Sequence, residues 1–373
     1  MHTRSASYLL ATLILMAPAH GKSEELVNGR RSLVFVGQAA KLVVDLAGGS
    51  IVDFHPREQE LNPLDWAGPK AGDTAPRAFG HFLCLDRWGP PSAAEGANGM
   101  PYHGEAAQVQ WQLLRDVSLA NGFLEAEMAA KLPLAGISVK RTVSLSRASP
   151  FFTVREEIKN ENRLGRIYNA VQHPTIGPPF LDETTVVDCN GRHGFAQGGS
   201  LPNPEEPSFY WPKALNQDGD AVNIRHLTND PNPNVVSYAI DDEYGWVTAA
   251  TPAKKLLIGY IWKSKDYPWV SLWRDVQGGK PSARGLEFGT TGLHQPYPVL
   301  VRQGRIFGRP LFEHLDAGEA VTKSYAAFLL TIPSDYSGVG RIQIGQSGLI
   351  LRERSGGKTR ELILETAGPL LQP

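Results

Sequence analysis

The sequence predicts an all-β protein, built as a large antiparallel β-sandwich. Segments in which apolar and polar residues alternate recur along the chain, for example at 107–113, 123–128 and 137–145. Such alternation is typical of strands that bury one face and expose the other. The 38 glycines and 28 prolines are spread through the chain and separate these segments with turns. Because we find no long amphipathic helix and no repeat of fixed period, we expect a sandwich of strands.

Residues 1–21 have the pattern of a secretory signal peptide. His2 and Arg4 form a short basic region, an apolar core follows at 8–16, and Ala-Pro-Ala at 17–19 offers small residues for cleavage. The apolar core is shorter than the roughly 20 residues that a membrane-spanning helix needs. We therefore expect a soluble protein that is secreted or periplasmic, without membrane insertion.

The mature chain is expected to contain one large domain and a small extension. Residues 22–332 should form the β-sandwich, and residues 333–373 a small C-terminal β extension. Residues 69–101 are rich in glycine, proline and alanine, interrupted by an apolar stretch at 79–85, and a loop of this length inside a compact domain tends to be functional. The expected strands are 32–36, 40–45, 48–54 with its turn, 107–113, 123–128, 137–145, 151–158, 168–171, 235–240, 246–250, 256–262, 269–273, 285–290 and 320–330, then 341–344, 349–353 and 361–365.

Charge and cysteine content narrow the class of function. Lysine and arginine total 37 against 38 aspartates and glutamates, a net charge of −1. This balance offers no basic surface for nucleic acid and no polybasic membrane patch. Cys84 and Cys189 are the two cysteines; they have no metal-site spacing, and both a disulfide and two buried thiols remain open.

A histidine before a proline is the first candidate for chemistry. His173 precedes Pro174, and proline holds the residue before it in extended geometry. Residues 168–171 are an expected strand, so His173 should stand at a strand end with its ring held by a stiff backbone. That suits a proton donor or a sugar-binding group; the alternative is a histidine that caps a sheet edge.

Two further polar residues beside glycines come from other parts of the chain. His103 lies in an Asn-Gly…His-Gly segment, and Glu287 is flanked by leucine and phenylalanine on a strand that ends in glycine. A carboxylate in an apolar setting tends to be buried, which raises its pKa and makes it a better base near neutral pH. The alternative for Glu287 is a core glutamate in a salt bridge with Arg284 or Arg274.

Taken in order, these motifs resemble the aldose 1-epimerase (galactose mutarotase-like) superfamily over residues 32–330. The motifs are Gly48-Gly49-Ser50-Ile51 at a strand-turn-strand opening, Asn98-Gly99 before His103-Gly104, His173-Pro174, the strand of Glu287, and Leu315-Asp316-Ala317-Gly318-Glu319. The chain departs from the family where Thr175-Ile176-Gly177-Pro178 replaces an aromatic-Asn-Leu sequence, which is closer to the divergent branches. The family's early arginine is also missing, and Arg87 or His81 is the candidate to replace it in binding substrate.

The resemblance implies a reaction and a set of roles. Opening a cyclic hemiacetal removes a proton from the anomeric hydroxyl and delivers one to the ring oxygen. Glu287 would be the base, His173 the acid, and His103 would hold the sugar or the developing charge. Acid–base help of this kind contributes roughly 10²–10⁴-fold. No metal or cofactor is required, and the expected partner is a small sugar or an oligosaccharide.

Tryptophans add a possible sugar-binding surface. Apolar ring faces stack on the C–H faces of sugars, and the indole N–H can donate to a hydroxyl. Five tryptophans lie in or beside loops rich in proline and glycine and the candidate site strands: Trp88, Trp211, Trp262, Trp269 and Trp273. Trp269 and Trp273 are the first candidates, because their strand runs toward Glu287. Core packing is the alternative for each of them.

Two other functions compete with the isomerase. One is a non-catalytic sugar-binding protein that keeps the sandwich and its aromatic groove. The other is a lyase or hydrolase-related sandwich, which would need a second carboxylate such as Glu105 or Asp86 for hydrolysis, or Tyr102 beside His173 for lyase chemistry. The isomerase hypothesis expects His173 and Glu287 to face one cleft, far enough apart to hold a pyranose ring.

Overall fold

The computed structural model describes residues 24–366 except 71, 199–200, 204–205, 207, 217, 227–231, 233 and 355–359. The predicted signal peptide lies outside the described residues, and so does the end of the predicted C-terminal extension. Export therefore stays a prediction. Within the described part of the chain, no helix is both long and apolar enough to cross a membrane.

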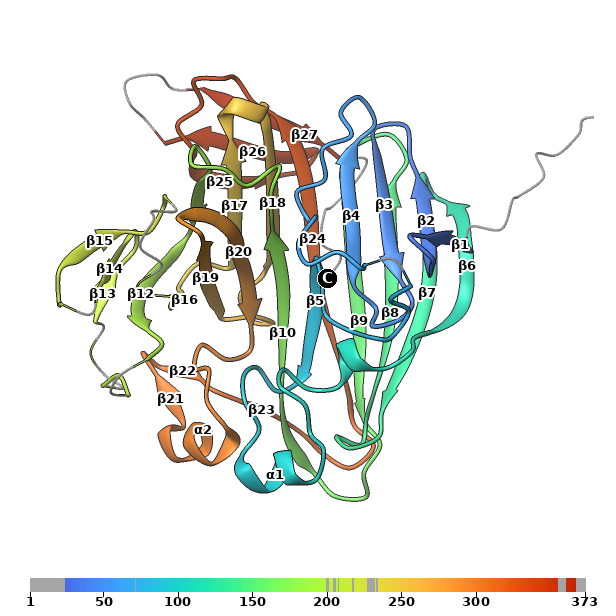
Figure 1. The fold of residues 1–373 in the computed structure, drawn as a ribbon, viewed down its shortest axis with the longest axis vertical. Helices are drawn as coiled ribbons and strands as arrows, with labels where there is room; N and C mark the ends of the chain where they lie inside the picture. The colour runs from blue at the N-terminus through green and yellow to red at the C-terminus, as the bar shows by residue number, and fades with distance from the viewer. Residues whose placement is uncertain are drawn as a thin grey trace, which may run out of the picture.

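Two large antiparallel sheets make up most of the molecule, which confirms the predicted β-sandwich (Figure 1). The larger sheet has twelve strands in the order β1 (Glu24–Val27), β2 (Arg30–Val36), β3 (Ala40–Asp45), β4 (Ile51–Pro56), β5 (His81–Asp86), β10 (Arg166–Ile176), β20 (Lys280–Gly289), β19 (Trp269–Gln277), β16 (Val235–Ile240), β12 (Gly191–Ala196) and β13 (Phe209–Tyr210), with β23 (Glu313–Leu315) paired to β10. The smaller sheet has eight strands in the order β11 (Val186–Cys189), β17 (Tyr244–Thr251), β18 (Leu256–Lys263), β24 (Ala320–Thr331), β9 (Phe151–Asn160), β8 (Ile137–Ser146), β7 (Phe123–Leu132) and β6 (Gln112–Ala120).

Small elements complete the described structure. They are the pairs β14 (Lys213–Leu215) with β15 (Ala221–Asn223) and β21 (Arg305–Ile306) with β22 (Arg309–Pro310), the three-stranded sheet β25 (Val339–Gly345), β26 (Gly348–Glu353) and β27 (Glu361–Glu365), the helices α1 (Ala93–Ala97) and α2 (Tyr297–Gln303), and 3₁₀ turns at Ala106–Gln108 and Pro252–Lys254. Figure 1 shows the three-stranded sheet at one end of the sandwich and the two helices at the other.

The alternating pattern of the sequence accounts for the core. On β3, Leu42 and Val44 are buried between the sheets, and on β8, Val139 and Val143 fill the same cluster. A second cluster joins the three-stranded sheet to the back of the smaller sheet, where Leu351 belongs to the same buried group as strands β18 and β24. Burial of these apolar faces against one another is what holds the layers together.

Strand β5 is a correction to the sequence analysis, which treated residues 69–101 as one long loop. Residues 81–86 form a central strand between β4 and β10, and α1 follows it. All six residues of β5 are buried. A strand buried on both faces shows no alternation, so its pattern does not identify it.

The central strands present two different faces, and this positions the site. On β10, the side chain of Gln172 donates to Glu156 of β9 in the opposite sheet, at 2.7 Å. Side chains of successive residues in a strand point to opposite faces. His173 therefore lies on the outer face of the larger sheet, away from the core.

The two cysteines are buried and free. Cys84 lies on β5 and Cys189 ends β11, so the two thiols belong to strands of different sheets. The structure therefore selects two buried thiols over a disulfide.

Candidate active site

His173 is held on the outer face of β10 by three neighbours. The register places it opposite Phe82 of β5, and the two rings stack with centroids 4.2 Å apart. Its Nδ1 lies 3.0 Å from the hydroxyl of Thr175, which is on the same face two residues further on. Its Nε2 lies 3.3 Å from Oε2 of Glu287. Both ring nitrogens have a partner, so the imidazole has a defined orientation.

The strand does not end at His173, as the sequence analysis expected. Strand β10 continues through Ile176, and Pro174 pairs with His81 on the β5 side. On the β20 side, the pairs are Gln172 with Phe288 and then Thr175 with Gly285. Proline has no N–H to donate to a neighbouring strand, and Pro174 lies between these two pairs, where no pairing with β20 occurs.

Glu287 projects from β20 onto the same outer face and is 1% exposed. Trp88, in the segment that follows β5, donates its indole N–H to Oε2 of Glu287 at 2.6 Å. A Cβ on Gly285 would lie 2.7 Å from Oε1 of Glu287, so a glycine two residues earlier leaves room for the carboxyl group. Indole and imidazole thus converge on one carboxyl oxygen.

These groups line one cavity of about 540 Å³ on the outer face of the larger sheet. Its walls combine aromatic rings with a small number of polar groups, which is the usual composition of a small-molecule site. The lining residues are Trp66, Ala78, Phe82, Trp88, Tyr102, His103, His173, Gln197, Gly198, Asn234, Val235, Trp273, Glu287, His294 and Gln295.

Histidines 103 and 294 form a second polar group beside the pair. Nδ1 of His103 accepts the backbone N–H of Gly89 at 3.1 Å, so a neutral His103 carries its proton on Nε2. The hydroxyl of Tyr102 lies 3.0 Å from Nε2 of His294. The ring of His103 is 5.5 Å from the rings of both His173 and His294. Three imidazoles therefore surround one end of the cavity.

Burial sets the protonation of the site. It raises the pKa of Glu287 to about 8, although the hydrogen bond from Trp88 opposes the shift. It lowers the pKa of His173 to about 3 and that of His294 to about 4, and it also lowers the pKa of His103. At neutral pH the carboxyl group is therefore protonated and the three imidazoles are neutral. This resting state is the reverse of the roles implied by the resemblance.

The separation of His173 and Glu287 also differs from expectation. They face the same cavity, as required, but they touch each other rather than standing a pyranose ring apart. The expected gap was not a necessary condition. The anomeric hydroxyl and the ring oxygen are bonded to the same carbon, so two groups that stand close together can reach both of them.

Arg87 and His81 do not reach the cavity, so neither replaces the family's early arginine there. Arg87 donates to the carboxylates of Asp86 and Glu95, at 2.7 and 2.9 Å. His81 lies on the core face of β5, with Nε2 3.2 Å from Oε1 of Gln172. The next residue, Phe82, points to the opposite face of the strand and lines the cavity.

Of the two chosen tryptophans, Trp273 lines the cavity and Trp269 does not. Trp269 is buried, and its indole donates to the carbonyl of Pro310 at 3.1 Å. Trp88, which was among the candidate tryptophans but not the first choice, also lines the cavity, and so does His294, which was not selected from the sequence. His294 follows closely after the strand of Glu287, in a Thr-Gly-Leu-His-Gln-Pro sequence, and that position was the available signal.

The geometry does not provide the second carboxylate that glycoside hydrolysis needs. Glu105 accepts the backbone N–H groups of Leu134 and Ala135, at 3.1 and 2.7 Å, and is used in the fold. Asp86 is buried in ion pairs with two arginines. Among the described lining residues, Glu287 is the one carboxylate.

The fold is that of galactose mutarotase-like proteins. A galactose mutarotase-like protein from Clostridium acetobutylicum aligns over 83% of this chain and 98% of its own, with a TM-score of 0.60 and 13% identity. A galactose mutarotase related enzyme from Lactobacillus acidophilus aligns over 81% and 98%, with a TM-score of 0.56 and 11% identity. A galactose mutarotase-like protein from Lactobacillus casei aligns over 80% and 100%, with a TM-score of 0.54 and 13% identity.

By sequence, the chain matches no protein-family model and no curated protein. Identities of 11–13% to the solved structures establish the shared fold and leave the reaction to be argued from the site.

Proposed function

We propose that this protein is an exported carbohydrate-active enzyme that interconverts the anomers of a sugar, as an aldose 1-epimerase does. The observation that carries the proposal is the contact between Glu287 and His173 in a cavity walled by aromatic rings. The pattern of residues 1–21 supports export. A sugar presents apolar C–H faces and many hydroxyls, and this cavity offers both kinds of partner.

The pair supplies one proton donor and one proton acceptor. In the resting state, protonated Glu287 donates to the ring oxygen while Nε2 of His173 accepts the proton of the anomeric hydroxyl. The bond between C1 and the ring oxygen breaks, which leaves an open-chain aldehyde, a carboxylate and an imidazolium. Rotation about C1–C2 exposes the other face of the aldehyde. Ring closure then reverses both proton transfers and restores the starting pair.

Burial and the neighbouring groups support this cycle. A pKa of about 8 for Glu287 makes it an acid that still holds its proton at neutral pH. When the proton leaves, the indole N–H of Trp88 stabilises the carboxylate that forms. Nδ1 of His173 lies within hydrogen-bond distance of the Thr175 hydroxyl, which can steady the imidazolium. His103 and His294 are placed to contact the sugar hydroxyls.

The test is the rate at which freshly dissolved α-glucose, α-galactose and other α-sugars reach anomeric equilibrium, followed by polarimetry or proton NMR. We expect wild-type protein to accelerate at least one sugar, and Glu287→Gln to lose about 10²–10⁴-fold of that rate. Glu183→Gln, which changes an exposed glutamate, is the matched control and should keep the rate. An active Glu287→Gln variant would refute the proposed mechanism.

A non-catalytic sugar-binding protein is the second candidate. The observation that favours it is the near-complete burial of the pair, with His173 5% and Glu287 1% exposed. Binding detected by tryptophan fluorescence, with no acceleration of any sugar, would select this alternative. Trp88 and Trp273 line the cavity and would report such binding.

A further inference from the structure

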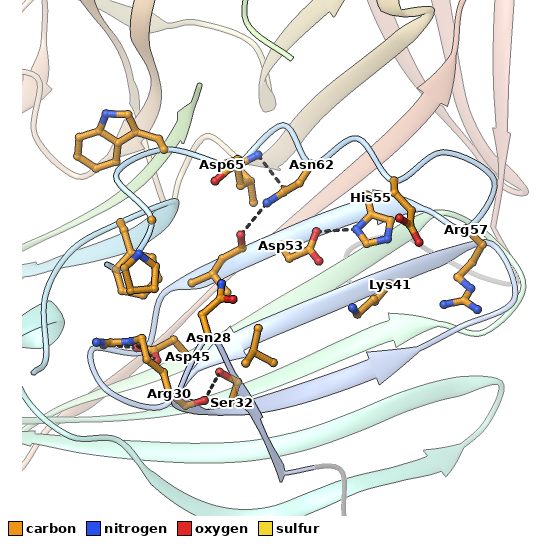
Figure 2. A pocket seen from close by; sticks show the side chains of 18 residues that line it. Asn28, Arg30, Ser32, Lys41, Asp45, Asp53, His55, Arg57, Asn62 and Asp65 are labelled. Carbon is orange, nitrogen blue, oxygen red and sulfur yellow. Dashed lines mark hydrogen bonds and ion pairs between the residues drawn. The ribbon is translucent and has the colours of Figure 1, made fainter. Parts of the chain in front are cut away.

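A second cavity lies on the same face of the same sheet as the catalytic cavity. It has a volume of about 400 Å³ and covers strands β2, β3 and β4 (Figure 2). On β3, Leu42 and Val44 face the core, so Lys41 and Asp45 point outward into this cavity. His173 is likewise on the outer face, so both cavities open on one side of the larger sheet.

The two cavities share a wall. Trp66 lines both of them, and the adjacent residues Ala78 and Phe79 line one cavity each. The ring of Trp66 stacks on Phe82, with centroids 6.3 Å apart, and meets Trp273 edge-on at 5.6 Å. A chain-like ligand in the catalytic cavity would therefore pass Trp66 to enter the second one.

The segment that contains Asn62 and Asp65 crosses above the second cavity and forms its roof. Hydrogen bonds hold this roof to the sheet. The side chain of Asn62 donates to the carbonyl of Val52 at 2.8 Å and accepts the N–H groups of Phe54 and Leu64, at 3.2 and 3.0 Å. Figure 2 shows Asn62 and Asp65 on the segment that crosses above the strands. A site that is formed before its ligand arrives loses less free energy to ordering on binding.

The polar groups in the second cavity suit a neutral ligand with many hydroxyls. Asp53 accepts from Nδ1 of His55 at 2.6 Å, and Lys41 stands opposite His55 on the neighbouring strand. Lys41 and Arg57 have no side-chain hydrogen bond or ion pair with any other described residue.

The charges that line the second cavity are balanced. The positive charges of Lys41 and Arg57 are opposed by three carboxylates, those of Asp53, Asp65 and Glu60. Arg30 is already paired with Asp45. The cavity thus has no excess of positive charge for a phosphate or an acidic sugar.

We propose that the second cavity is a subsite for further sugar units, and that the substrate is a neutral oligosaccharide. Its reducing-end unit occupies the catalytic cavity, and the next units pass Trp66 and enter the space between Lys41, Asp53 and the roof. The catalytic part of this statement rests on the proposed function, but the binding part does not.

Calorimetric titration of the full mature chain tests the subsite. Glucose is compared with maltotriose, cellotriose and laminaritriose, and galactose with β-1,4-galactotriose. We expect at least one trisaccharide to bind about tenfold more tightly than its monosaccharide, which corresponds to about 1.4 kcal/mol. Lys41→Met and Asp53→Asn should each reduce this ratio of affinities. Lys131→Met removes an exposed lysine outside both cavities and should leave the ratio unchanged.

The outcomes separate the two proposals. Equal affinity for every trisaccharide and its monosaccharide, or a ratio that survives both variants, overturns the subsite even if monosaccharide anomers are interconverted. A trisaccharide preference that depends on Lys41 and Asp53, in a protein that accelerates no sugar, supports the subsite and overturns the proposed reaction. Failure of the protein to bind any of these sugars overturns the subsite, and failure to accelerate any sugar of the wider panel overturns the proposed reaction.

Discussion

The two faces of strands β5 and β10 carry histidines in opposite settings. His81 and His173 are both buried, and burial lowers the pKa of each to about 3. His81 faces the core, where the rings of Tyr260 and Tyr325 lie 5.3 Å away. His173 faces a cavity and touches Glu287, a carboxyl group that keeps its proton at neutral pH. Burial alone therefore does not make a histidine a candidate for catalysis; an open space and a proton-bearing partner are also needed.

Replacement of His173, the histidine that faces the cavity, should have the largest effect on activity. His173→Asn removes the proton acceptor, and we expect the rate of anomer interconversion to fall by about 10²–10⁴-fold. The measurement is anomeric NMR on the sugar that the wild type accelerates best. His314→Asn changes a histidine whose side chain is 55% exposed and serves as the control. A His173→Asn variant with full activity would remove the distinction between the two faces.

The carboxyl group of the pair should make stability depend on pH. The pKa of Glu287 is raised from 4.5 to about 8 in the folded protein, so the folded state binds this proton more tightly than the unfolded state. Its contribution to stability is present below pH 4.5 and is lost as the pH rises to about 8. As the pH rises through this window, the unfolding free energy of the wild type should therefore fall relative to that of Glu287→Gln, by up to roughly 5 kcal/mol.

Urea denaturation of both proteins at several pH values between 4 and 9 measures this difference. His173 contacts Glu287, so the two groups titrate as a coupled pair and the difference reports the pair. A difference in unfolding free energy that stays constant with pH would mean that Glu287 is ionised in the folded state, against the proton placement argued above.

Replacement of His81, the histidine that faces the core, should reduce stability and leave activity unchanged. His81→Ala leaves a void between two tyrosine rings and removes the hydrogen-bond partner of Gln172. We expect a loss of about 2–4 kcal/mol in unfolding free energy. Folded His81→Ala protein should keep the wild-type rate per molecule, because His81 does not line the cavity. A selective loss of rate without a loss of stability would contradict the assignment of His81 to the core.

The sequence predicts the strands whose apolar and polar residues alternate. It does not predict strands or side-chain orientations that depend on contacts with residues distant in the sequence. Alternating segments such as 137–145 were found because one face of each strand is buried and the other is not. Strand β5 was missed because both of its faces are buried. Whether His81 faces the core or the cavity depends on a register of one residue, which no composition argument resolves.

The same limit applies to the site. The resemblance indicated His103, His173 and Glu287, and all three line one cavity. Trp88 comes from a segment between strands, where no periodicity marks it, and the signal for His294 was its position shortly after the strand of Glu287. Their role follows only from contacts across the sheet, such as the hydrogen bond from Trp88 to a carboxyl group 199 residues away.

The smallest expected effect concerns the indole that holds the carboxyl group in place. Trp88→Phe keeps an aromatic ring but removes the N–H that stabilises the carboxylate, so the pKa of Glu287 should rise further. A hydrogen bond to a charged group contributes about 1.5–3 kcal/mol, which corresponds to about 1–2 pH units. In the proposed mechanism protonated Glu287 is the acid, so the alkaline limb of the pH–rate profile should move to higher pH by up to this amount.

Trp269→Phe is the matched control for this change, because it also removes an indole N–H, but one that donates to the carbonyl of Pro310 outside the cavity. Its alkaline limb should coincide with that of the wild type. If Trp88→Phe shifts the acidic limb instead, Glu287 acts as the carboxylate base and His173 as the acid. The proton would then rest on the imidazole in the active form, and contact with substrate would have to overcome the effect of burial on both groups.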